Sequence, residues 1–381
     1  MPILKSSSSY LRGLARKRPP NFAPPLDRMS RLLEEGSYGC AFTPALPCKQ
    51  MKKRQGRTVG KVMKAKYADL ELEVAPIVEG IPGWKRYFIV QEEENCTVKN
   101  FAEIRKTYER NCKVIQSAAD INLIQLISPY GGRTLFDTPI DSSFDFMENL
   151  RHVLEGVALL QAQGICHYDI KDNNILVDSA GTLRLIDFGQ SFLGDQITDA
   201  DIKRHQYDFD PTYWPQSPEM SVQNAIHNQH PLSQAIPQTI EKKSTFKLME
   251  NVLGVSKMRA ENDLRNFWNQ QEEYHGTGGT GGTGGTGGTG GTEGKGGTWT
   301  AFYKVYWRTW DSWSIGAVFL RILQKCFLQK TFVEGVWKQH GILLRHVLKG
   351  LLEADPRKRL LPAGALTLLR AAATAGNPPS A

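Results

Sequence analysis

The sequence predicts an α+β protein with two lobes: a small, mostly-β lobe that carries one main helix, and a larger, mostly-α lobe. The chain has 381 residues, of which 40% are hydrophobic and 23% are charged. This is enough apolar material for two packed units, and it excludes a wholly disordered chain. Short strand-like runs predominate from Leu32 to Ile127, and helical spacing of apolar residues predominates after Asp141.

The first lobe is assigned to residues 30–130 and contains five expected strands. Turn-forming or charged stretches separate them, and they occupy residues 31–35, 40–42, 58–63, 87–90 and 122–127. A helix of modest quality is expected from Tyr67 to Val78, with a break near Pro76.

The second lobe, residues 131–375, begins with a long helix and a compact hairpin. Asp141 or Ser142 would cap the helix and Gly164 would stop it, and its apolar residues form one stripe. The runs ILVD and LRLID alternate on either side of a turn that contains Gly181, which predicts two paired strands.

Two stretches depart from this pattern. Residues 1–29 form a basic tail that we expect to be disordered. Residues 276–297 repeat the triplet GGT, which has no apolar side chain to pack, so a flexible tether is expected. The tether belongs to an insert at about 222–305, whose earlier part has partly helical spacing.

The net charge of +8 is concentrated in residues 1–20 and 49–66, which contain basic but no acidic residues. The rest of the chain is mildly acidic, so we expect no sequence-specific nucleic-acid binding, although either basic stretch could touch an acidic partner. The apolar run Ile315–Leu320 is too short to span a membrane.

The six cysteines are scattered along the chain without a close pair or a matching histidine set. We therefore expect neither a zinc site nor a disulfide framework, and we expect a reducing, cytoplasmic location.

The strongest functional signal is HYDIKDNN at residues 167–174, which IDFGQ follows at residues 186–190. Phosphoryl transfer requires an acid to orient the attacking hydroxyl, a cation beside the phosphate and ligands for a metal. Asp169 and Lys171 are candidates for the first two roles. Asn174 and Asp187 offer oxygen ligands suited to Mg²⁺, and the hairpin between the motifs would bring all four residues together.

These motifs resemble those of the eukaryotic-type protein kinases, whose catalytic loop reads HRDLKxxxN and whose metal motif reads DFG. The resemblance implies a bilobal kinase that uses ATP and Mg²⁺. It also implies that Gly36 and Gly39 belong to a phosphate-binding loop, although Gly-Ser-Tyr-Gly alone would be an ordinary hairpin turn.

The resemblance further implies that Lys61 holds the α- and β-phosphates and that a helix glutamate pairs with it. Lys64 remains open as a substitute for Lys61. Glu71 is favoured as the partner over Glu73, because Leu72, Val74 and Val78 continue a helical apolar set.

Three more motifs fit the same family. SPE at residues 217–219 and DPRKR at residues 355–359 imply a buried ion pair between Glu219 and Arg359. Asp311 in DSWSIG would hold the backbone of the catalytic loop. Together these motifs favour a protein kinase over the aminoglycoside-type phosphotransferases.

A narrower resemblance lies in GSYGCAFTPALPC, residues 36–48, followed by VGKVM. It is similar to the serine/threonine kinases of large cytoplasmic DNA viruses, which would imply the host cytoplasm or the virion as the location.

Some positions depart from the family pattern. Glu34 replaces the first loop glycine and would bring a carboxylate toward the nucleotide. Tyr168 replaces the arginine that receives an activation-loop phosphate, so the predicted activity does not require loop phosphorylation. Thr212 sits where the family has a structural threonine near the substrate. The stretch between Glu219 and Asp311 is unusually long, and a surface insert is favoured over a rebuilt lobe.

The sequence thus predicts a serine/threonine kinase that acts on protein substrates. The hydroxyl preference follows from Lys171, since in the family a lysine at this position accompanies aliphatic hydroxyl acceptors. The alternatives are a pseudokinase scaffold, which Glu34 and Tyr168 favour, and a small-molecule phosphotransferase. No particular oligomeric state is predicted.

Overall fold

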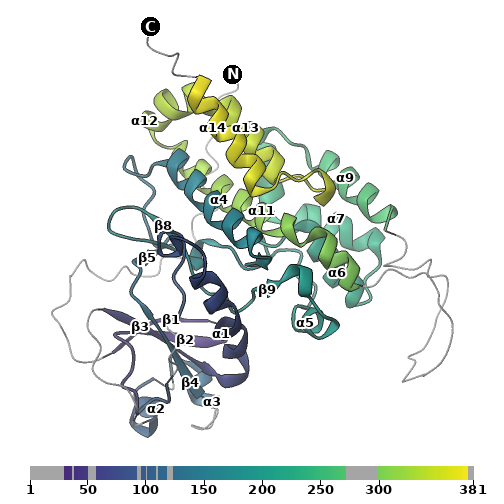
Figure 1. Ribbon diagram of the computed structural model, residues 1–381. Coiled ribbons are helices and arrows are strands. Elements are labelled where there is room, and N and C mark those ends of the chain that lie inside the picture. Colours follow the sequence, from purple (N-terminus) through teal and green to yellow (C-terminus); the bar gives the residue numbers. More distant parts are fainter. Residues whose placement is uncertain are drawn as a thin grey trace, which may run out of the picture.

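The computed structural model describes residues 30–36, 38–49, 57–91, 96–99, 101–108, 110–117, 123–271 and 299–375. A β-sheet with a few helices makes up the first part of the chain, and a larger group of helices makes up the rest (Figure 1). This arrangement confirms the predicted two-lobed α+β fold. The basic tail of residues 1–29 and the tether of residues 276–297 lie outside the described residues.

Four antiparallel strands form the sheet of the small lobe in the order β1-β2-β3-β4. They are β1 (Arg31–Glu35), β2 (Gly39–Thr43), β3 (Thr58–Lys64) and β4 (Leu123–Pro129). In the central strand β3, Lys61 lies opposite Ala41 of β2 and Leu126 of β4. Four of the five predicted strands are therefore confirmed.

The remaining predicted strand, at residues 87–90, is wrong. Phe88 and Val90 are buried, but the segment makes only an isolated bridge to Leu185. The amide of Ile89 donates to the carbonyl oxygen of Leu185 at 3.0 Å. A connection buried between the two lobes has the same apolar character as a strand, so composition alone could not separate them.

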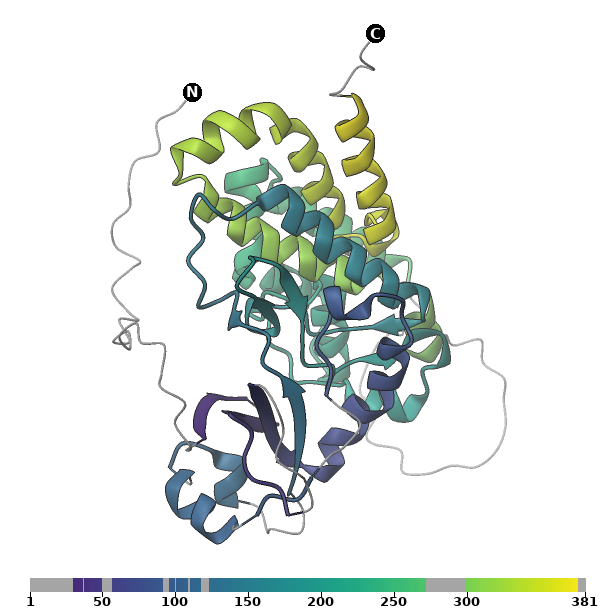
Figure 2. The ribbon, with the colours of Figure 1, turned by 60° about the vertical axis from the view of Figure 1, so that its left-hand side comes forward.

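Helix α1 (Ala65–Glu79) packs beside the sheet, as both views show (Figures 1 and 2). It continues through Pro76, so the predicted break is wrong. Val74, Ala75 and Val78 are buried in the main core on both sides of the proline. This burial stabilises the last turn against the loss of one backbone hydrogen bond.

Two disulfides cross-link the small lobe, which corrects the expectation of no disulfide framework. Cys40 of β2 bonds to Cys112, and Cys48 bonds to Cys96. The partners are 72 and 48 residues apart, so only the tertiary fold reveals the pairing. Disulfides persist in oxidising environments, and the expected reducing compartment therefore does not follow. Cys166 and Cys326 are buried free thiols.

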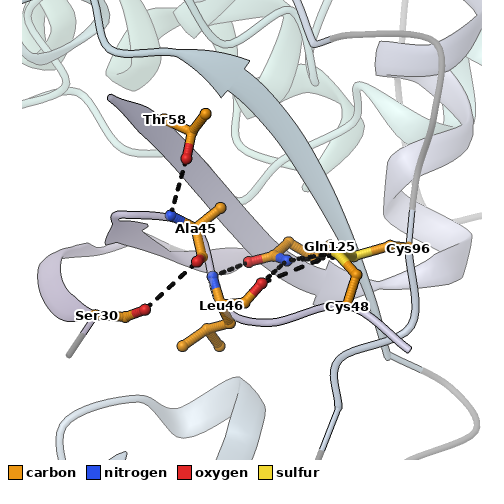
Figure 3. Close-up of a disulfide and its surroundings, with 7 residues drawn as sticks. All are labelled: Ser30, Ala45, Leu46, Cys48, Thr58, Cys96 and Gln125. Carbon is orange, nitrogen blue, oxygen red and sulfur yellow. Dashed lines mark hydrogen bonds between the residues drawn. A yellow bond between two sulfur atoms is a disulfide. The ribbon is translucent and has the colours of Figure 1, made fainter. Parts of the chain in front are cut away.

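Gln125 of β4 braces the second disulfide from the sheet (Figure 3). Its side-chain amide exchanges hydrogen bonds of 2.8 and 2.9 Å with the backbone of Leu46, and its nitrogen lies 3.3 Å from the sulfur of Cys96. Gln125 is completely buried. Two short helices, α2 (Phe101–Tyr108) and α3 (Lys113–Ser117), complete the lobe on this side.

The long helix of the second lobe is α4 (Phe146–Ala162), and its cap is Asp145. The Asp145 side chain accepts a hydrogen bond from the Glu148 amide at 2.9 Å, so the predicted cap at Asp141 or Ser142 lies too early. Asp141 instead accepts from the amide of Ser143 in the preceding turn. The predicted apolar stripe is buried in the main core.

The predicted hairpin is confirmed as β7 (Ile175–Val177) and β8 (Leu183–Leu185), which are antiparallel. The remaining strands are β5 (Arg133–Thr134), which pairs with β7, and the pair β6 (Ile165–Cys166) and β9 (Phe192–Leu193).

The rest of the second lobe is helical. Its helices are α5 (Asp199–Arg204), α6 (Pro218–His227), α7 (Leu232–Lys242), α8 (Ser244–Leu248), α9 (Lys257–Asn269), α11 (Trp299–Cys326), α12 (Lys330–Phe332), α13 (Lys338–Leu351) and α14 (Pro362–Ala375). Shorter helical turns occupy Trp84–Arg86, Asp172–Asn174, Gly194–Gln196, Met249–Leu253, Val333–Trp337 and Pro356–Lys358. Within the described residues, no helix has both the length and the apolar character needed to cross a bilayer.

The segment expected to be a surface insert contributes buried side chains to the main core. Ile236, Phe246, Leu264 and Phe267 are buried in the same cluster as the apolar stripe of α4. This burial counts against a surface insert over residues 222–271 and favours the alternative of a rebuilt lobe. Sequence length alone cannot distinguish the two, because both add residues between the same motifs.

Candidate active site

All eight predicted site residues line one cleft of about 280 Å³ between the sheet and the helical lobe. Strands β1 to β3 and helix α1 supply one wall, and the loops around the β7–β8 hairpin supply the other. The eight are Gly36, Gly39, Lys61, Glu71, Asp169, Lys171, Asn174 and Asp187. Two cavities elsewhere are larger, about 330 and 400 Å³, but they contain none of these residues.

Lys61 connects the sheet, helix α1 and the second lobe. Its ammonium group contacts the carboxylate of Glu71 and lies 2.7 Å from Oδ1 of Asp187. Glu71 is buried, whereas Glu73 is exposed and Lys64 lies at the end of β3. Of the alternatives left open by the sequence, the structure therefore brings together Lys61 and Glu71.

The charges in this cluster favour an ionised lysine. Burial lowers the pKa of Lys61, but the adjacent Asp187 and Glu71 outweigh it, so that its pKa lies above the usual value. Burial raises the pKa of Asp187, and Lys61 and Lys171 more than compensate, so that this pKa lies below the usual value. Both groups are therefore charged at neutral pH.

Asp169 is surrounded by donors on the opposite wall. Its carboxylate accepts hydrogen bonds from Lys171 at 2.8 and 3.1 Å and from the Asn174 amide at 2.8 Å. It also accepts one from the hydroxyl of Tyr213 at 2.7 Å. The carboxylate is thereby fixed in position at the base of the cleft.

Asp311 holds the loop that carries Asp169, as predicted. Its two carboxylate oxygens accept from the backbone amides of His167 at 2.8 Å and Tyr168 at 2.9 Å. Tyr168 and Asp187 both have φ of 66°, a region that side chains other than glycine rarely adopt. The surrounding contacts impose these two conformations, one on each motif.

Asn174 and Asp187 fit the donor set of a hard cation. The Asn174 amide nitrogen points to Asp169, since it also donates to the Asp169 backbone carbonyl at 2.9 Å. The amide oxygen is then the atom suited to a cation, beside the Asp187 carboxylate in the same cleft. Amide and carboxylate oxygens are ligands that Mg²⁺ prefers.

The glycine turn joins β1 to β2 over the cleft. The amide of Gly36 donates to the carbonyl oxygen of Gly39 at 2.8 Å, which is the geometry of a tight hairpin turn. A Cβ atom at Gly39 would lie 2.6 Å from the carbonyl oxygen of Val62, so packing against β3 requires glycine there. A Cβ atom at Gly36 would meet nothing closer than 3.6 Å.

Glu34 also lines the cleft. It accepts a long hydrogen bond of 3.4 Å from the side chain of Asn173. Burial raises the pKa of Glu34, and Lys171 only partly offsets this effect.

Tyr168 is packed among aromatic rings, two of which belong to the segment that follows Asp187. Its ring makes edge contacts with Phe192, His205 and Trp310 at centroid distances of 5.5, 5.2 and 5.6 Å. The two ring nitrogens of His205 lie 2.8 Å from the carbonyl oxygen of Asp201 and 2.9 Å from that of Gln190. The loop after the second motif is thus anchored by aromatic packing, by His205 contacts with backbone carbonyl oxygens and by an ion pair of 2.8 Å between Asp195 and Arg308.

The ion pair predicted between Glu219 and Arg359 is confirmed. The guanidinium binds both carboxylate oxygens, at 2.7 and 2.8 Å, and both side chains are completely buried. The pair ties the start of α6 to the loop before α14.

Sequence reasoning missed two residues near the site. Tyr213 contacts Asp169, whereas the neighbouring Thr212 turns away and donates to Asp210 at 2.6 Å. Lys243, at the end of α7, is completely buried and donates to the backbone carbonyl oxygen of Tyr213. Neither belongs to a motif, and Lys243 stands in the polar stretch EKKST of residues 241–245, so the sequence around it gives no sign of its burial.

Comparison with protein families agrees with this geometry. Residues 106–230 match the family model of the protein kinase domain. The fold is that of a protein kinase. The matched residues include the loop with Asp169 and the hairpin that leads to Asp187, whereas strands β1 to β3 of the kinase fold lie outside them.

Curated relatives match over shorter stretches. The serine/threonine-protein kinase PSK2 of Saccharomyces cerevisiae is 31% identical over 116 residues, which are 27% of this chain and 10% of the relative. A probable serine/threonine-protein kinase of Dictyostelium discoideum is 29% identical over 132 residues, 33% of this chain and 20% of the relative. Cyclin-dependent kinase 7 of Xenopus laevis is 31% identical over 107 residues, 23% of this chain and 29% of the relative. The chain thus spans less than a third of the length of each.

Proposed function

We propose that this chain is a protein kinase that transfers the γ-phosphoryl group of ATP to serine or threonine hydroxyls of protein substrates. The observation that carries the proposal is the convergence of Lys61, Asp169, Asn174 and Asp187 on one cleft. The names of the relatives support the same reaction and the same acceptor class.

Each residue has a role in this reaction. Lys61, held by Glu71, binds the α- and β-phosphates, and the backbone of the turn at Gly36 and Gly39 covers them. Asp169 orients the acceptor hydroxyl and takes up its proton, and Lys171 stabilises charge on the transferred phosphoryl group.

Asn174 and Asp187 are the residues that would hold Mg²⁺. A metal held there would neutralise the negative charge that builds up on the phosphates during transfer. The chain contributes the oxygen ligands and fixes Asp187 through its contact with Lys61.

The alternative of a pseudokinase scaffold retains some support. Glu34 places a carboxylate in the cleft, and the Tyr213 hydroxyl occupies one side of Asp169. A test must therefore measure transfer, since nucleotide binding would be common to both functions.

The decisive experiment incubates the full chain with labelled ATP, Mg²⁺ and a generic basic protein, beside an Asp169→Asn variant. We expect label on serine and threonine of the protein and at least a hundredfold less with the variant. Equal, background incorporation by both would favour the scaffold, and label on an added metabolite but not on protein would favour a small-molecule phosphotransferase.

Two narrower proposals accompany this function. The likeness to kinases of large cytoplasmic DNA viruses rests on residues 36–48 and the VGKVM strand, and no relative named above is viral. A cytoplasmic location is likewise a proposal, and the two disulfides of the small lobe count against a reducing compartment.

A further inference from the structure

Tyr213 lies where an acceptor hydroxyl has to bind. Its phenolic oxygen is 2.7 Å from Oδ1 of Asp169, and the residue keeps 37% of its surface exposed. The segment that carries it runs between α5 and α6, so Tyr213 reaches Asp169 from 44 positions away in the chain.

The other sides of the Asp169 carboxylate are occupied. Oδ2 accepts from Lys171 and from Asn174, both at 2.8 Å, and Oδ1 accepts from Lys171 at 3.1 Å. Because a carboxylate oxygen has few acceptor directions, a substrate hydroxyl that binds Oδ1 has to take the position of the Tyr213 hydroxyl.

The backbone around Tyr213 is held in place from two directions. Asp210 accepts from the amide and the hydroxyl of Thr212 at 2.8 and 2.6 Å, which forms a turn just before Tyr213. The buried Lys243 donates to the Tyr213 carbonyl oxygen, and Thr245 donates to the Trp214 carbonyl oxygen at 3.1 Å. The position of the Tyr213 ring is therefore set by hydrogen bonds between this segment and the residues at the end of α7 and the start of α8.

We propose that Tyr213 is a specificity-determining residue whose hydroxyl stands in for the acceptor hydroxyl on Asp169. A substrate must displace it, so Tyr213 weakens the binding of poorly fitting acceptors without affecting the nucleotide. This inference rests on the proposed kinase function.

The test compares the full-length wild type with Tyr213→Phe, which keeps the ring and removes only the competing hydroxyl. At saturating ATP, KM for a basic peptide that contains serine should fall about three- to tenfold. This is the change in affinity expected when the substrate no longer has to displace one hydrogen bond. KM for ATP should stay within twofold. Tyr306→Phe is the matched control, because Tyr306 lies in α11 and the hydroxyl that donates to Asp169 is that of Tyr213.

An unchanged or raised peptide KM with a lower kcat would overturn the proposal, since Tyr213 would then serve to position Asp169. A second measurement does not depend on catalysis: the affinity of the fluorescent peptide in the presence of a non-hydrolysable ATP analogue. Tighter binding to Tyr213→Phe supports the proposal even if the wild type transfers no phosphate, an outcome that would refute only the kinase function. Equal binding to both proteins refutes the inference.

Discussion

Four carboxylates line the cleft, and they differ in their cationic partners. Glu71 and Asp187 contact Lys61, and Asp169 contacts Lys171. Glu34 forms no ion pair with a lysine or arginine in the described part of the chain, and it accepts only a long hydrogen bond from Asn173 there. Because ATP is a polyanion, this is the carboxylate whose charge opposes nucleotide binding most directly.

Replacing Glu34 by Gln should therefore strengthen nucleotide binding. We expect KM for ATP to fall several-fold, which corresponds to about 1 kcal/mol of binding free energy, because one negative charge near the phosphates is removed. The gain should shrink at high salt. Nucleotide titrations at two ionic strengths measure it, with Glu35→Gln as the control because Glu35 does not line the cleft. Weaker nucleotide binding by Glu34→Gln would contradict this prediction and would show that the Glu34 carboxylate helps to bind the nucleotide.

Lys243 is the second residue with an unusual charge environment. Burial lowers its pKa to about 7, although Asp210 and Glu219 act in the opposite direction. The unfolded chain has the ordinary lysine pKa of about 10.4. Between these two values the unfolded state binds a proton that the folded state does not, so the free energy of unfolding rises with pH.

The Lys243→Met variant should lose this dependence. From pH 7 to pH 9 the wild type should gain up to about 1.4 kcal/mol of stability per pH unit relative to the variant. Urea unfolding at several pH values measures the difference, and the exposed neighbour Lys242, replaced by Met, is the control. Parallel pH profiles for Lys243→Met and wild type would contradict the assignment.

At the scale of elements, the small lobe depends on covalent links as well as on packing. Its sheet has one short helical pair, α2 and α3, on the side where Cys40 and Cys112 are joined. The second disulfide, Cys48–Cys96, joins the β2–β3 connection to the segment before α2. The first disulfide therefore ties the sheet to the segment between α2 and α3, and the second ties the β2–β3 connection to the segment before α2.

Removing the Cys40–Cys112 disulfide should destabilise the small lobe. For a closed loop of this length, the variant with Cys40 and Cys112 both replaced by Ala should lose roughly 2–4 kcal/mol. Chemical unfolding with and without a thiol reductant measures this loss. The control variant with all four paired cysteines replaced should not respond to the reductant, and a wild type that is equally insensitive would mean that the bonds do not form.

The helices of the second lobe show which element boundaries a sequence predicts well. The apolar stripe of α4 and the β7–β8 hairpin follow from local spacing, and both are confirmed. The cap at Asp145 is a local contact with the Glu148 amide, and it was placed too early because Asp141 and Ser142 offered the same capping chemistry. The intact helix at Pro76 and the two disulfides depend on contacts made by distant residues. Local patterns carry no information about such contacts, so these features were missed or predicted wrongly.

At the scale of the whole molecule, the Glu219–Arg359 pair joins segments 140 positions apart. Both side chains are completely buried. The Arg359→Met variant leaves a buried carboxylate without its cation and should lose 3–5 kcal/mol, roughly. The double variant Glu219→Gln, Arg359→Met should lose less than the sum of the two single losses.

Urea unfolding of the three variants tests this coupling. The exposed pair Lys330–Glu334 provides the control, since Lys330→Met should change stability by less than about 1 kcal/mol. An effect of Arg359→Met as small as that of Lys330→Met would refute the structural role of the buried pair.

The candidate site could be predicted far better than the lobe that surrounds it. Asp169, Asn174 and Asp187 lie in two short motifs around one hairpin, so local sequence already brings them together. Tyr213 and Lys243 reach the site through the packing of α7 and α8, which depends on the buried set around Phe246. That packing is a property of the complete lobe, and a surface insert was predicted in its place.

The aromatic setting of Tyr168 has a consequence for how the chain responds to its surroundings. When an activation loop is held by an ion pair between a phosphate and an arginine, salt weakens that ion pair by screening. Dephosphorylation removes the ion pair altogether. The edge-to-face contacts of Tyr168 with Phe192 and Trp310 involve neither a phosphate nor a charged pair, so neither treatment removes them. The ring contacts of Tyr168 therefore need neither a phosphate nor low ionic strength, whereas the exposed ion pair between Asp195 and Arg308 in the same loop weakens as salt is added.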